Sequence, residues 1–318
     1  MSSLLSIQNL IVEFTDRGEV TNRPIRGIDL EVGTNEIVGI VGETGCGKSL
    51  TGLAVLGLLP SGARASGRVL LEGRDQLARD TANRGGAVSI VFQNPGTAFN
   101  PVFTIERQLA DVLQRHWKLG RRQAARRVVE HLGLVGLPDP ARVARSYPHE
   151  LSGGMLQRAM IAMSLLCEPK LLILDEPTTA LDVTVAKQIL DLVLQLQRQF
   201  GFSVLLITHN LGVVRDVCTR VAVLYAGRVI ELGPTLAVLD HPKHPYTSGL
   251  LSALPGTHLK GERLNAITGS VPSNLLAIRG CSFASRCPLV LADCLEIDPA
   301  LMPVAVGHSS ACIRAELL

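Results

Sequence analysis

Short, continuous apolar runs recur along this chain of 318 residues and alternate with segments in which apolar residues have helical spacing. The runs EIVGIV at 36–41, KLLILD at 170–175 and SVLLIT at 203–208 are rich in Val, Ile and Leu and short for helices. Such runs are typical of parallel strands that are buried on both faces. Between the last two, VAKQILDLVLQLQRQF at 185–200 predicts a helix. The alternation predicts an α/β fold with a doubly wound sheet.

The segments outside these runs have different patterns. Residues 1–35 alternate apolar and polar positions, which predicts antiparallel strands before the first buried strand. Residues 104–137 combine helical spacing with many charges and predict a helical insertion. From about Pro234 the pattern becomes irregular and rich in Pro, Gly and Ser, so we expect a domain boundary there.

Composition and charge exclude several classes of protein. With 47% apolar residues the chain can bury a large core, and its formal net charge of +3 is not concentrated in any block. The charge therefore gives no argument for nucleic acid as a partner. No run of eighteen apolar residues occurs, and the N-terminal segment lacks the basic and apolar regions of a signal peptide. We therefore expect the protein to stay in the cytosol.

A glycine-rich segment follows the first buried run. Residues 42–49 read GETGCGKS and match the P-loop pattern, between a predicted strand and a predicted helix. In such a loop successive N–H groups point at phosphate, and the helix N-terminus adds partial positive charge. Lys48 would then reach the terminal phosphates of a nucleotide and Ser49 would ligate Mg²⁺. A chance glycine-rich turn is the competing interpretation, and the strand-to-helix context argues against it.

Two carboxylates end the second buried run. Asp175 and Glu176 follow LLIL, so the first is placed to hold Mg²⁺ and the second to polarise an attacking water. An Asp-Glu pair alone is weak evidence, because a solvated helix cap before Pro177 has the same appearance. The P-loop makes the catalytic interpretation the stronger one.

Between these two motifs lies a third. Residues 151–158 read LSGGMLQR and closely resemble the signature motif that distinguishes ABC ATPases from other P-loop proteins. Further residues match that family in order, over residues 4 to about 233. Gln93 lies in a segment similar to the Q-loop, residues 180–182 resemble the D-loop, and His209 resembles the switch histidine. Phe14 resembles the adenine-stacking aromatic residue, although a core aromatic is an open alternative at that position.

The resemblance implies an architecture. We expect a P-loop ABC ATPase domain over residues 1–233, with a RecA-like core, an antiparallel β subdomain and a helical signature subdomain at about 96–158. Residues 234–318 would form a C-terminal extension that contains cysteines.

The resemblance also implies a site for ATP and Mg²⁺. Its catalytic residues would be Lys48, Gln93, Glu176 and His209, and its Mg²⁺ ligands Ser49, Gln93 and Asp175. The remaining nucleotide contacts would come from Phe14, Gly42, Glu43, Thr44, Gly45, Cys46, Gly47, Leu50, Ser152, Gly153, Gly154 and Asp182.

In this family two ATPase domains form a head-to-tail dimer, in which the P-loop of one chain and the signature motif of the other close on one ATP. The resemblance implies that ATP closes this dimer and that hydrolysis reopens it. It also implies that the partner ATPase is an identical or homologous chain.

Three stretches resemble the peptide-uptake branch of the family: QNPGTAFNP at 93–101, YPHELSGGM at 147–155 and HPKHPYTSGLLSALP at 241–255. The last also marks nickel importers. The resemblance implies an importer ATPase for di- and oligopeptides at the cytoplasmic face of the inner membrane, with two permease subunits and an extracytoplasmic substrate-binding protein. We expect residues 93–117 to contact a permease.

Two alternatives stay open. The chain could serve a nickel or other small-solute importer of the same branch, because substrate contacts lie in other subunits. A soluble ABC ATPase acting on nucleic acid is the more distant alternative, and the lack of a basic stripe argues against it.

Four cysteines crowd the last 38 residues: Cys281, Cys287, Cys294 and Cys312. They resemble the cysteine-bearing tail of the peptide-importer branch, and four thiolates suit Zn²⁺ or a four-iron, four-sulfur cluster. Because the close C-x-x-C pairs usual for zinc are lacking, we favour iron–sulfur. Unligated cysteines in a small core are the alternative.

The sequence departs from the family at two positions. Cys46 stands where Ser is frequent, and Leu156 replaces the Arg that commonly follows an LSGGM-like pentad. A thiol at a helix N-terminus predicts a lowered pKa for Cys46, and hence alkylation that MgATP slows.

Overall fold

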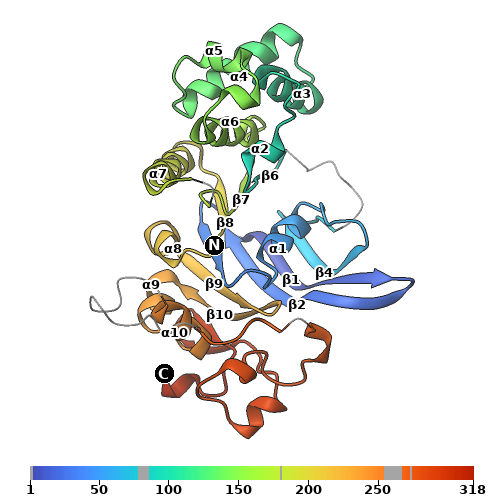
Figure 1. Ribbon diagram of the computed structural model, residues 1–318, viewed down its shortest axis with the longest axis vertical. Helices are drawn as coiled ribbons and strands as arrows, with labels where there is room; N and C mark the ends of the chain where they lie inside the picture. Colours follow the sequence, from blue (N-terminus) through green and yellow to red (C-terminus); the bar gives the residue numbers. More distant parts are fainter. Residues whose placement is uncertain (1–2, 78–85, 180, 254–266, 273) are drawn as a thin grey trace. The chain divides into compact units, whose positions relative to one another are not determined.

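The computed structural model (Figure 1) describes residues 3–77, 86–179, 181–253, 267–272 and 274–318. The chain divides into two compact units. The first unit comprises residues 1–33, 37–78 and 206–318, and the second comprises residues 34–36 and 79–205. The tail beyond Pro234 thus belongs to the same unit as the phosphate loop. The domain limits 1–233 and 234–318 stay predictions.

An antiparallel sheet opens the first unit. Strand β1 (Ser3–Asp16) pairs with β2 (Glu19–Gly33) on one side and with β4 (Ala63–Leu71) on the other, and β5 (Arg74–Asp75) pairs with β4. Leu5, Leu10 and Val12 of β1 are fully buried, whereas Gln8 is exposed. One apolar face therefore holds this sheet in place, as the alternation at 1–35 predicts.

A second group of strands in the first unit carries the phosphate loop. Strand β3 (Ile37–Val41) runs parallel to β9 (Arg220–Tyr225), with Val41 opposite Val223, and β10 (Arg228–Pro234) pairs antiparallel with β9. Every residue of β3 is buried, which is the environment that its continuous apolar run predicts. The helices of this unit are α1 (Lys48–Val55), α8 (Leu211–Val217), α9 (Thr235–Asp240) and α10 (Pro245–Ser252).

The described part of the C-terminal tail that follows α10 is mostly irregular and lies beside β10 and α10 (Figure 1). Its hairpin of β11 (Met302–Ala305) and β12 (His308–Ser310) extends the sheet, because β12 pairs with β10. The rings of Tyr225, Tyr246 and Phe283 pack together with centroids 4.6 to 5.4 Å apart. Such aromatic pairs stabilise by about 0.5–1.5 kcal/mol beyond their area burial. The described tail also contains short 3₁₀ turns: η2 (Leu275–Ala277), η3 (Ala284–Arg286), η4 (Ala292–Leu295) and η5 (Ala315–Leu317).

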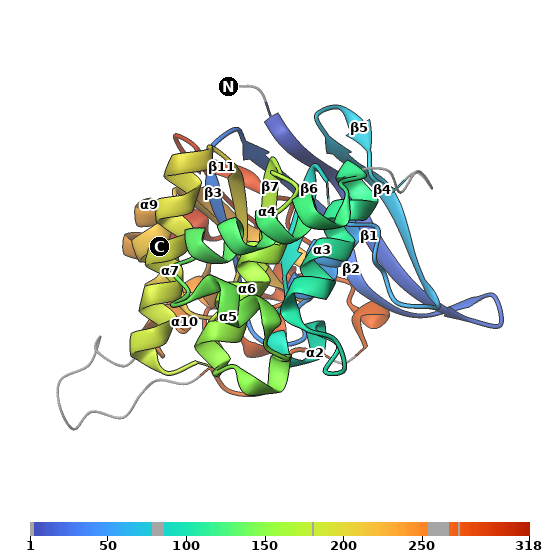
Figure 2. The same ribbon diagram turned by 90° about the horizontal axis from the view of Figure 1, so that it is seen from above.

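The second unit contains the predicted helical insertion. Ile105, Leu109 and Leu113 recur every four residues along α3 and are fully buried, as are Val128 and Leu132 of α4. These faces pack helix against helix, and Figure 2 shows α3, α4, α5 and α6 gathered together. The helices are α2 (Pro95–Ala98), α3 (Ile105–Trp117), α4 (Arg121–Leu134), α5 (Pro140–Arg145), η1 (Pro148–Glu150), α6 (Gly153–Leu165) and α7 (Val183–Phe200).

The strands of the second unit are parallel. Strand β6 (Val88–Val91) pairs with β7 (Leu171–Asp175), with Val91 opposite Leu174. Strand β8 (Ser203–Ile207) is the other neighbour of β7 and passes from the second unit into the first. The carboxyl ends of β6 and β7 therefore meet at one edge of the sheet.

Candidate nucleotide site

The phosphate loop, residues 42–49, joins β3 to α1 within the first unit. A Cβ at Gly42 would lie 2.2 Å from the carbonyl oxygen of Leu224, so only glycine fits between the two strands. Gly47 has φ +106° and caps α1 in a left-handed conformation, which favours glycine. Thr44 and Gly45 are exposed, Ser49 is exposed in the first turn of α1, and Leu50 is half-buried. The loop thus lies at the N-terminus of α1, a position suited to binding phosphate.

The Lys48 side chain lies inside this loop. Its Nζ donates hydrogen bonds to the carbonyl oxygens of Gly42, at 2.8 Å, and Glu43, at 2.9 Å. Lys48 is 5% exposed, and a buried ammonium is costly unless polar groups surround it. The lysine and the loop backbone therefore form one hydrogen-bonded unit.

The environment of Cys46 contradicts the pKa that the sequence predicts for its thiol. Its side chain is fully buried, and burial raises the pKa of the thiol, whereas the helix N-terminus predicted a lowered pKa. The charge of nearby Lys48 lowers the pKa of Cys46, but by less than burial raises it. The effect of desolvation on the thiol pKa is stronger than that of the helix N-terminus, because the sulfur packs inward, toward Gly42, rather than outward at the helix start.

His209 follows β8 and belongs to the first unit. The N–H of Thr208 donates to the carbonyl oxygen of Ile40 over 3.1 Å, which aligns the end of β8 with the end of β3. His209 is exposed and comes one residue later. It therefore lies at the strand edge from which the phosphate loop departs.

The second unit brings Gln93 and Glu176 together. Gln93 follows β6 and Glu176 follows β7, and the Gln93 Nε2 donates to Glu176 Oε2 over 3.1 Å. Thr179 Oγ1 donates to the same carboxylate oxygen over 2.9 Å. Asp175 is 9% exposed at the end of β7, and Glu176 has φ +46°, a left-handed conformation uncommon outside glycine. The bend turns the Glu176 side chain away from the strand direction and toward Gln93.

The LSGG motif starts helix α6. Ser152 is the N-cap residue, and its Oγ accepts a hydrogen bond from the N–H of Met155 over 3.3 Å. Ser152 and Gly153 are exposed. A Cβ at Gly154 would lie 2.9 Å from Cγ1 of Val185 in α7, so the second glycine permits close packing of the two helices. The exposed helix start leaves backbone N–H groups available to an anion.

Asp182 caps the next helix. Its Oδ1 accepts from the N–H of Val185 over 3.0 Å at the start of α7. Ala180, the first residue of the predicted D-loop, lies outside the described residues.

Leu156, the departure from the family pattern, is 8% exposed on the inward face of α6, which explains why an apolar residue is accommodated there. Phe14 lies in β1 opposite Asn22 and Ala63 and is half-buried.

The four tail cysteines line one small cavity, together with His244 and Phe283. The cavity has a volume of about 20 Å³, which is about the space of one water. Burial raises the pKa of Cys287 and Cys312, and raises that of Cys281 to about 11. Over the described part of the chain, no group of three or more His, Cys, Asp or Glu residues is placed to hold a metal ion. The predicted iron–sulfur site is therefore not supported as a preformed site, because the thiols sit around a space too small for a cluster.

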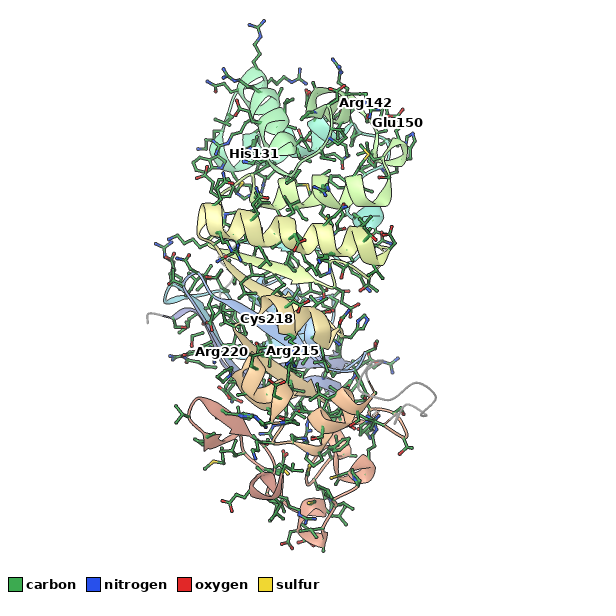
Figure 3. The ribbon with its side chains drawn as sticks, turned by 90° about the vertical axis from the view of Figure 1, so that its left-hand side faces the viewer. His131, Arg142, Glu150, Arg215, Cys218 and Arg220 are labelled. Atoms are coloured by element: carbon green, nitrogen blue, oxygen red, sulfur yellow. The ribbon has the colours of Figure 1, made fainter. Side chains whose placement is uncertain are left out.

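The other two cysteines are buried. Cys167 is 7% exposed and Cys218, labelled in Figure 3, is 8% exposed. Burial raises the pKa of both thiols, and that of Cys218 to about 12. We interpret both as small apolar side chains that contribute to packing and not to the nucleotide site.

Three contacts of the site were not expected from the sequence: Thr179 on Glu176, and Tyr246 and Arg286 on Glu43. Thr179 lies three residues after Glu176, a spacing that a search for hydroxyl donors near the catalytic carboxylate could have found. Tyr246 and Arg286 lie about two hundred residues beyond the phosphate loop, and no local pattern connects them with it.

Many ATPases share a glycine-rich loop between a buried parallel strand and a helix, but a helix that starts at LSGG is characteristic of one class. The fold and these motifs assign the chain to the ABC-type ATPases. Residues 25–179 match the family described as ABC transporter, and residues 230–294 match the C-terminal region of oligopeptide/dipeptide transporters. The chain belongs to the ATP-binding proteins of ABC transporters, in the branch that carries this C-terminal region.

Curated relatives agree over the full chain. It is 44% identical, over 98% of its length, to the probable peptide ABC transporter ATP-binding protein y4tR of Sinorhizobium fredii and to the dipeptide transport ATP-binding protein DppD of Bacillus subtilis, covering 95% of each. It is 46% identical to the oligopeptide transport ATP-binding protein OppD of Mycobacterium tuberculosis, over 100% of this chain and 53% of that protein.

Solved structures agree on the fold. One match is the ATP-binding cassette MJ0796, in a dimeric post-hydrolysis state bound to ADP and phosphate. It has a TM-score of 0.63 and 25% sequence identity, and the match covers 73% of this chain and 98% of MJ0796. CbiO1 of Clostridium perfringens, part of the ABC transporter complex cbiONQ, matches with TM-score 0.64 and 28% identity over 76% of this chain and 92% of its own. Among the described residues, no helix is both long and apolar enough to cross a membrane.

Proposed function

We propose that this ATPase powers the uptake of di- and oligopeptides through an ABC importer. The observation that carries the proposal is the match of residues 230–294 to the C-terminal region of oligopeptide/dipeptide transporters, in one chain with the phosphate loop. The names of the relatives, which are peptide transport ATP-binding proteins, support the same substrate class.

The chemistry proposed is in-line attack of water on the γ-phosphorus of ATP. Lys48, the loop N–H groups and Mg²⁺ would stabilise the negative charge of the transition state, with Ser49 and Asp175 as Mg²⁺ ligands. Glu176 would orient or deprotonate the water, held by its hydrogen bond from Gln93. His209 would contact the γ-phosphate.

The exposed start of α6 supports a shared site. Ser152, Gly153 and Gly154 would bind the γ-phosphate of an ATP held by a second ATPase chain, because their helix start is open to an anion. Asp182 would lie at the same dimer interface, and Phe14 would stack on the adenine. Two permease subunits at the cytoplasmic face of the membrane would complete the transporter, with residues 93–117 as their contact.

Transport assays test the substrate. In cells that lack this subunit, we expect uptake of a labelled dipeptide to be lost, to return with the wild-type chain and to stay absent with Glu176→Gln. Loss of nickel uptake with unchanged peptide uptake would overturn the proposed substrate and leave the ATPase assignment intact.

We also propose that the four tail cysteines take up an iron–sulfur cluster, supported by their arrangement around one cavity. Since the cavity is small, the thiols would have to move apart and lose their protons on binding. An anaerobic preparation with iron and visible charge-transfer absorption would support this. A preparation with neither would reject it in favour of unligated cysteines.

A further inference from the structure

Glu43, the second residue of the phosphate loop, is bound by an arginine from the C-terminal tail. Arg286 Nη1 lies 2.6 Å from Glu43 Oε2, and Arg286 Nη2 lies 2.9 Å from Glu43 Oε1. The Arg286 side chain is 4% exposed and that of Glu43 is 28% exposed. A two-point pair of this kind fixes both position and orientation of the carboxylate, and it is stronger when water is excluded.

The backbone of Glu43 is held as well. Its N–H donates to Tyr246 Oη over 2.9 Å, and Tyr246, in α10, is fully buried. Burial raises the pKa of the Tyr246 hydroxyl, so it stays protonated at neutral pH. The side chain and the backbone of one loop residue are thus both anchored outside the loop.

The two anchors belong to a cluster of packed aromatic side chains. Phe283 packs edge-on against Tyr225 and Tyr246, and Tyr225 Oη accepts a further hydrogen bond from Arg286. The guanidinium lies 5.7 Å from the ring centroid of Tyr225, and its Nε donates to the carbonyl oxygen of Thr268 over 2.9 Å. These contacts together orient the Arg286 side chain toward Glu43.

Glu43 also contacts Lys48, so the restraint on Glu43 extends to the lysine of the loop. Its carbonyl oxygen accepts from Lys48 Nζ at 2.9 Å, beside the bond from Lys48 to Gly42. A displacement of Glu43 would move one of the two carbonyl oxygens that position the ammonium. The contacts run without interruption from Arg286 and Tyr246, through Glu43, to Lys48.

We propose that Arg286 and Tyr246 are positioning residues that hold the phosphate loop, through Glu43, in its phosphate-binding conformation. A loop that is ordered in advance loses little conformational entropy when it binds ATP, whereas a free loop must be ordered by the ligand. The tail therefore contributes to ATP affinity through the phosphate loop.

A purely structural tail contact makes a different prediction, and the chain offers a matched control. Arg26 of β2 also joins the tail to the rest of the unit, since its Nη1 donates to Ser282 Oγ over 2.7 Å and its Nη2 lies 3.7 Å from Asp298. Both of these side-chain contacts are with the tail, and neither is with the phosphate loop. Loss of tail attachment alone should affect Arg26 and Arg286 variants alike.

The test uses the full-length chain, with ATP affinity measured by calorimetric titration and turnover measured in the assembled transporter. For Arg286→Gln we expect a dissociation constant and a KM for ATP about tenfold higher, with kcat within about twofold of wild type. Arg286→Lys should retain part of the affinity because it keeps one charged contact. Arg26→Gln should bind ATP like wild type.

Two further variants complete the design. Glu43→Gln should weaken ATP binding as Arg286→Gln does, and the double variant should be no weaker than either single one, since both remove the same link. Tyr246→Phe keeps the ring and its packing, so it tests the hydrogen bond should Arg286→Gln fail to fold. Equal ATP affinity in Arg286→Gln and Arg26→Gln, additive losses in the double variant, or unchanged affinity in Tyr246→Phe would overturn the proposal.

Discussion

The side-chain amide of Gln93 donates a hydrogen bond to the carboxylate of Glu176 over 3.1 Å, although the two residues are 83 positions apart in the chain. Parallel pairing of β6 and β7 produces this contact, because each residue follows the carboxyl end of its strand. The contact connects the predicted Q-loop with the predicted general base.

Replacement of Glu176 by Gln should abolish turnover and leave ATP binding intact. The amide keeps the size of the side chain and its bonds to Gln93 and Thr179, but it cannot accept a proton from water. We expect kcat to fall by about 10²–10⁴-fold, the usual contribution of general acid–base catalysis. Steady-state ATP hydrolysis and ATP-induced dimer formation, followed by size-exclusion chromatography, measure the two effects. Near-normal hydrolysis in this variant would contradict the assignment of Glu176.

The hydrogen bonds that hold Glu176 predict a smaller effect. Thr179→Val keeps the shape of the side chain but removes its bond to Oε2, and Gln93→Ala removes the other donor. A hydrogen bond to a charged group contributes about 1.5–3 kcal/mol, so each variant should lose about tenfold or more in kcat. Thr184→Val, at an exposed position near the start of α7, is a suitable control. Wild-type kcat in Thr179→Val would show that Glu176 is positioned by other groups.

The sequence predicted those parts of this fold that depend on local patterns. The continuous apolar runs identified β3, β7 and β8, and helical spacing identified α3 and α4. The motif order led to the ABC class, which the family match confirms. The contacts of Glu43 with Tyr246 and Arg286 could not be predicted, because they depend on how an irregular tail packs.

Cys46 shows a different reason for failure. The helix N-terminus was visible in the sequence, and its effect on a thiol pKa is general. The burial of the sulfur was not visible, because it depends on the direction of one side chain between β3 and its neighbours. Desolvation then dominates the pKa, and the prediction was wrong in sign.

Cys46 should accordingly react slowly with alkylating reagents. Its thiol is fully buried and its pKa is raised, so little thiolate is present at neutral pH and access is closed. Mass spectrometry of metal-free protein after timed exposure to N-ethylmaleimide should show faster labelling of Cys287, which is half-exposed, than of Cys46. In denaturant the two rates should converge. Labelling of Cys46 in the folded protein as fast as that of Cys287 would contradict the buried position.

His244 should make the stability of the fold depend on pH. It is 1% exposed, and burial lowers its pKa to about 3. Its Nδ1 accepts from the N–H of Tyr246 over 3.1 Å at the start of α10, and this bond requires the unprotonated nitrogen. Between about pH 6.5 and pH 3 the unfolded chain takes up a proton that the folded chain does not, so the free energy of unfolding falls as the pH falls. The slope contributed by one such group approaches about 1.4 kcal/mol per pH unit.

His244→Asn isolates this contribution. Asparagine can cap the helix through its side-chain oxygen but does not titrate. We expect urea unfolding of this variant between pH 6.5 and pH 4 to show a shallower loss of stability than wild type. An identical pH slope in both proteins would exclude His244 as the responsible group.

Gly42 should be the least replaceable glycine of the phosphate loop for the stability of the fold. A Cβ there would lie 2.2 Å from the carbonyl oxygen of Leu224 and 2.9 Å from Cys46 Sγ, and the first of these is backbone of strand β9. Since a strand in a paired sheet cannot yield by the distance required, Gly42→Ala should destabilise by about 2 kcal/mol or more. Gly120→Ala is the control, because its position has no atom within 4 Å of the added carbon and a negative φ of −66°. As an N-cap substitution at the start of α4, it should lower the free energy of unfolding by no more than about 1 kcal/mol. Comparable urea midpoints for the two variants would mean that β3 and β9 can separate without cost, and the close approach at Gly42 would then not explain the glycine.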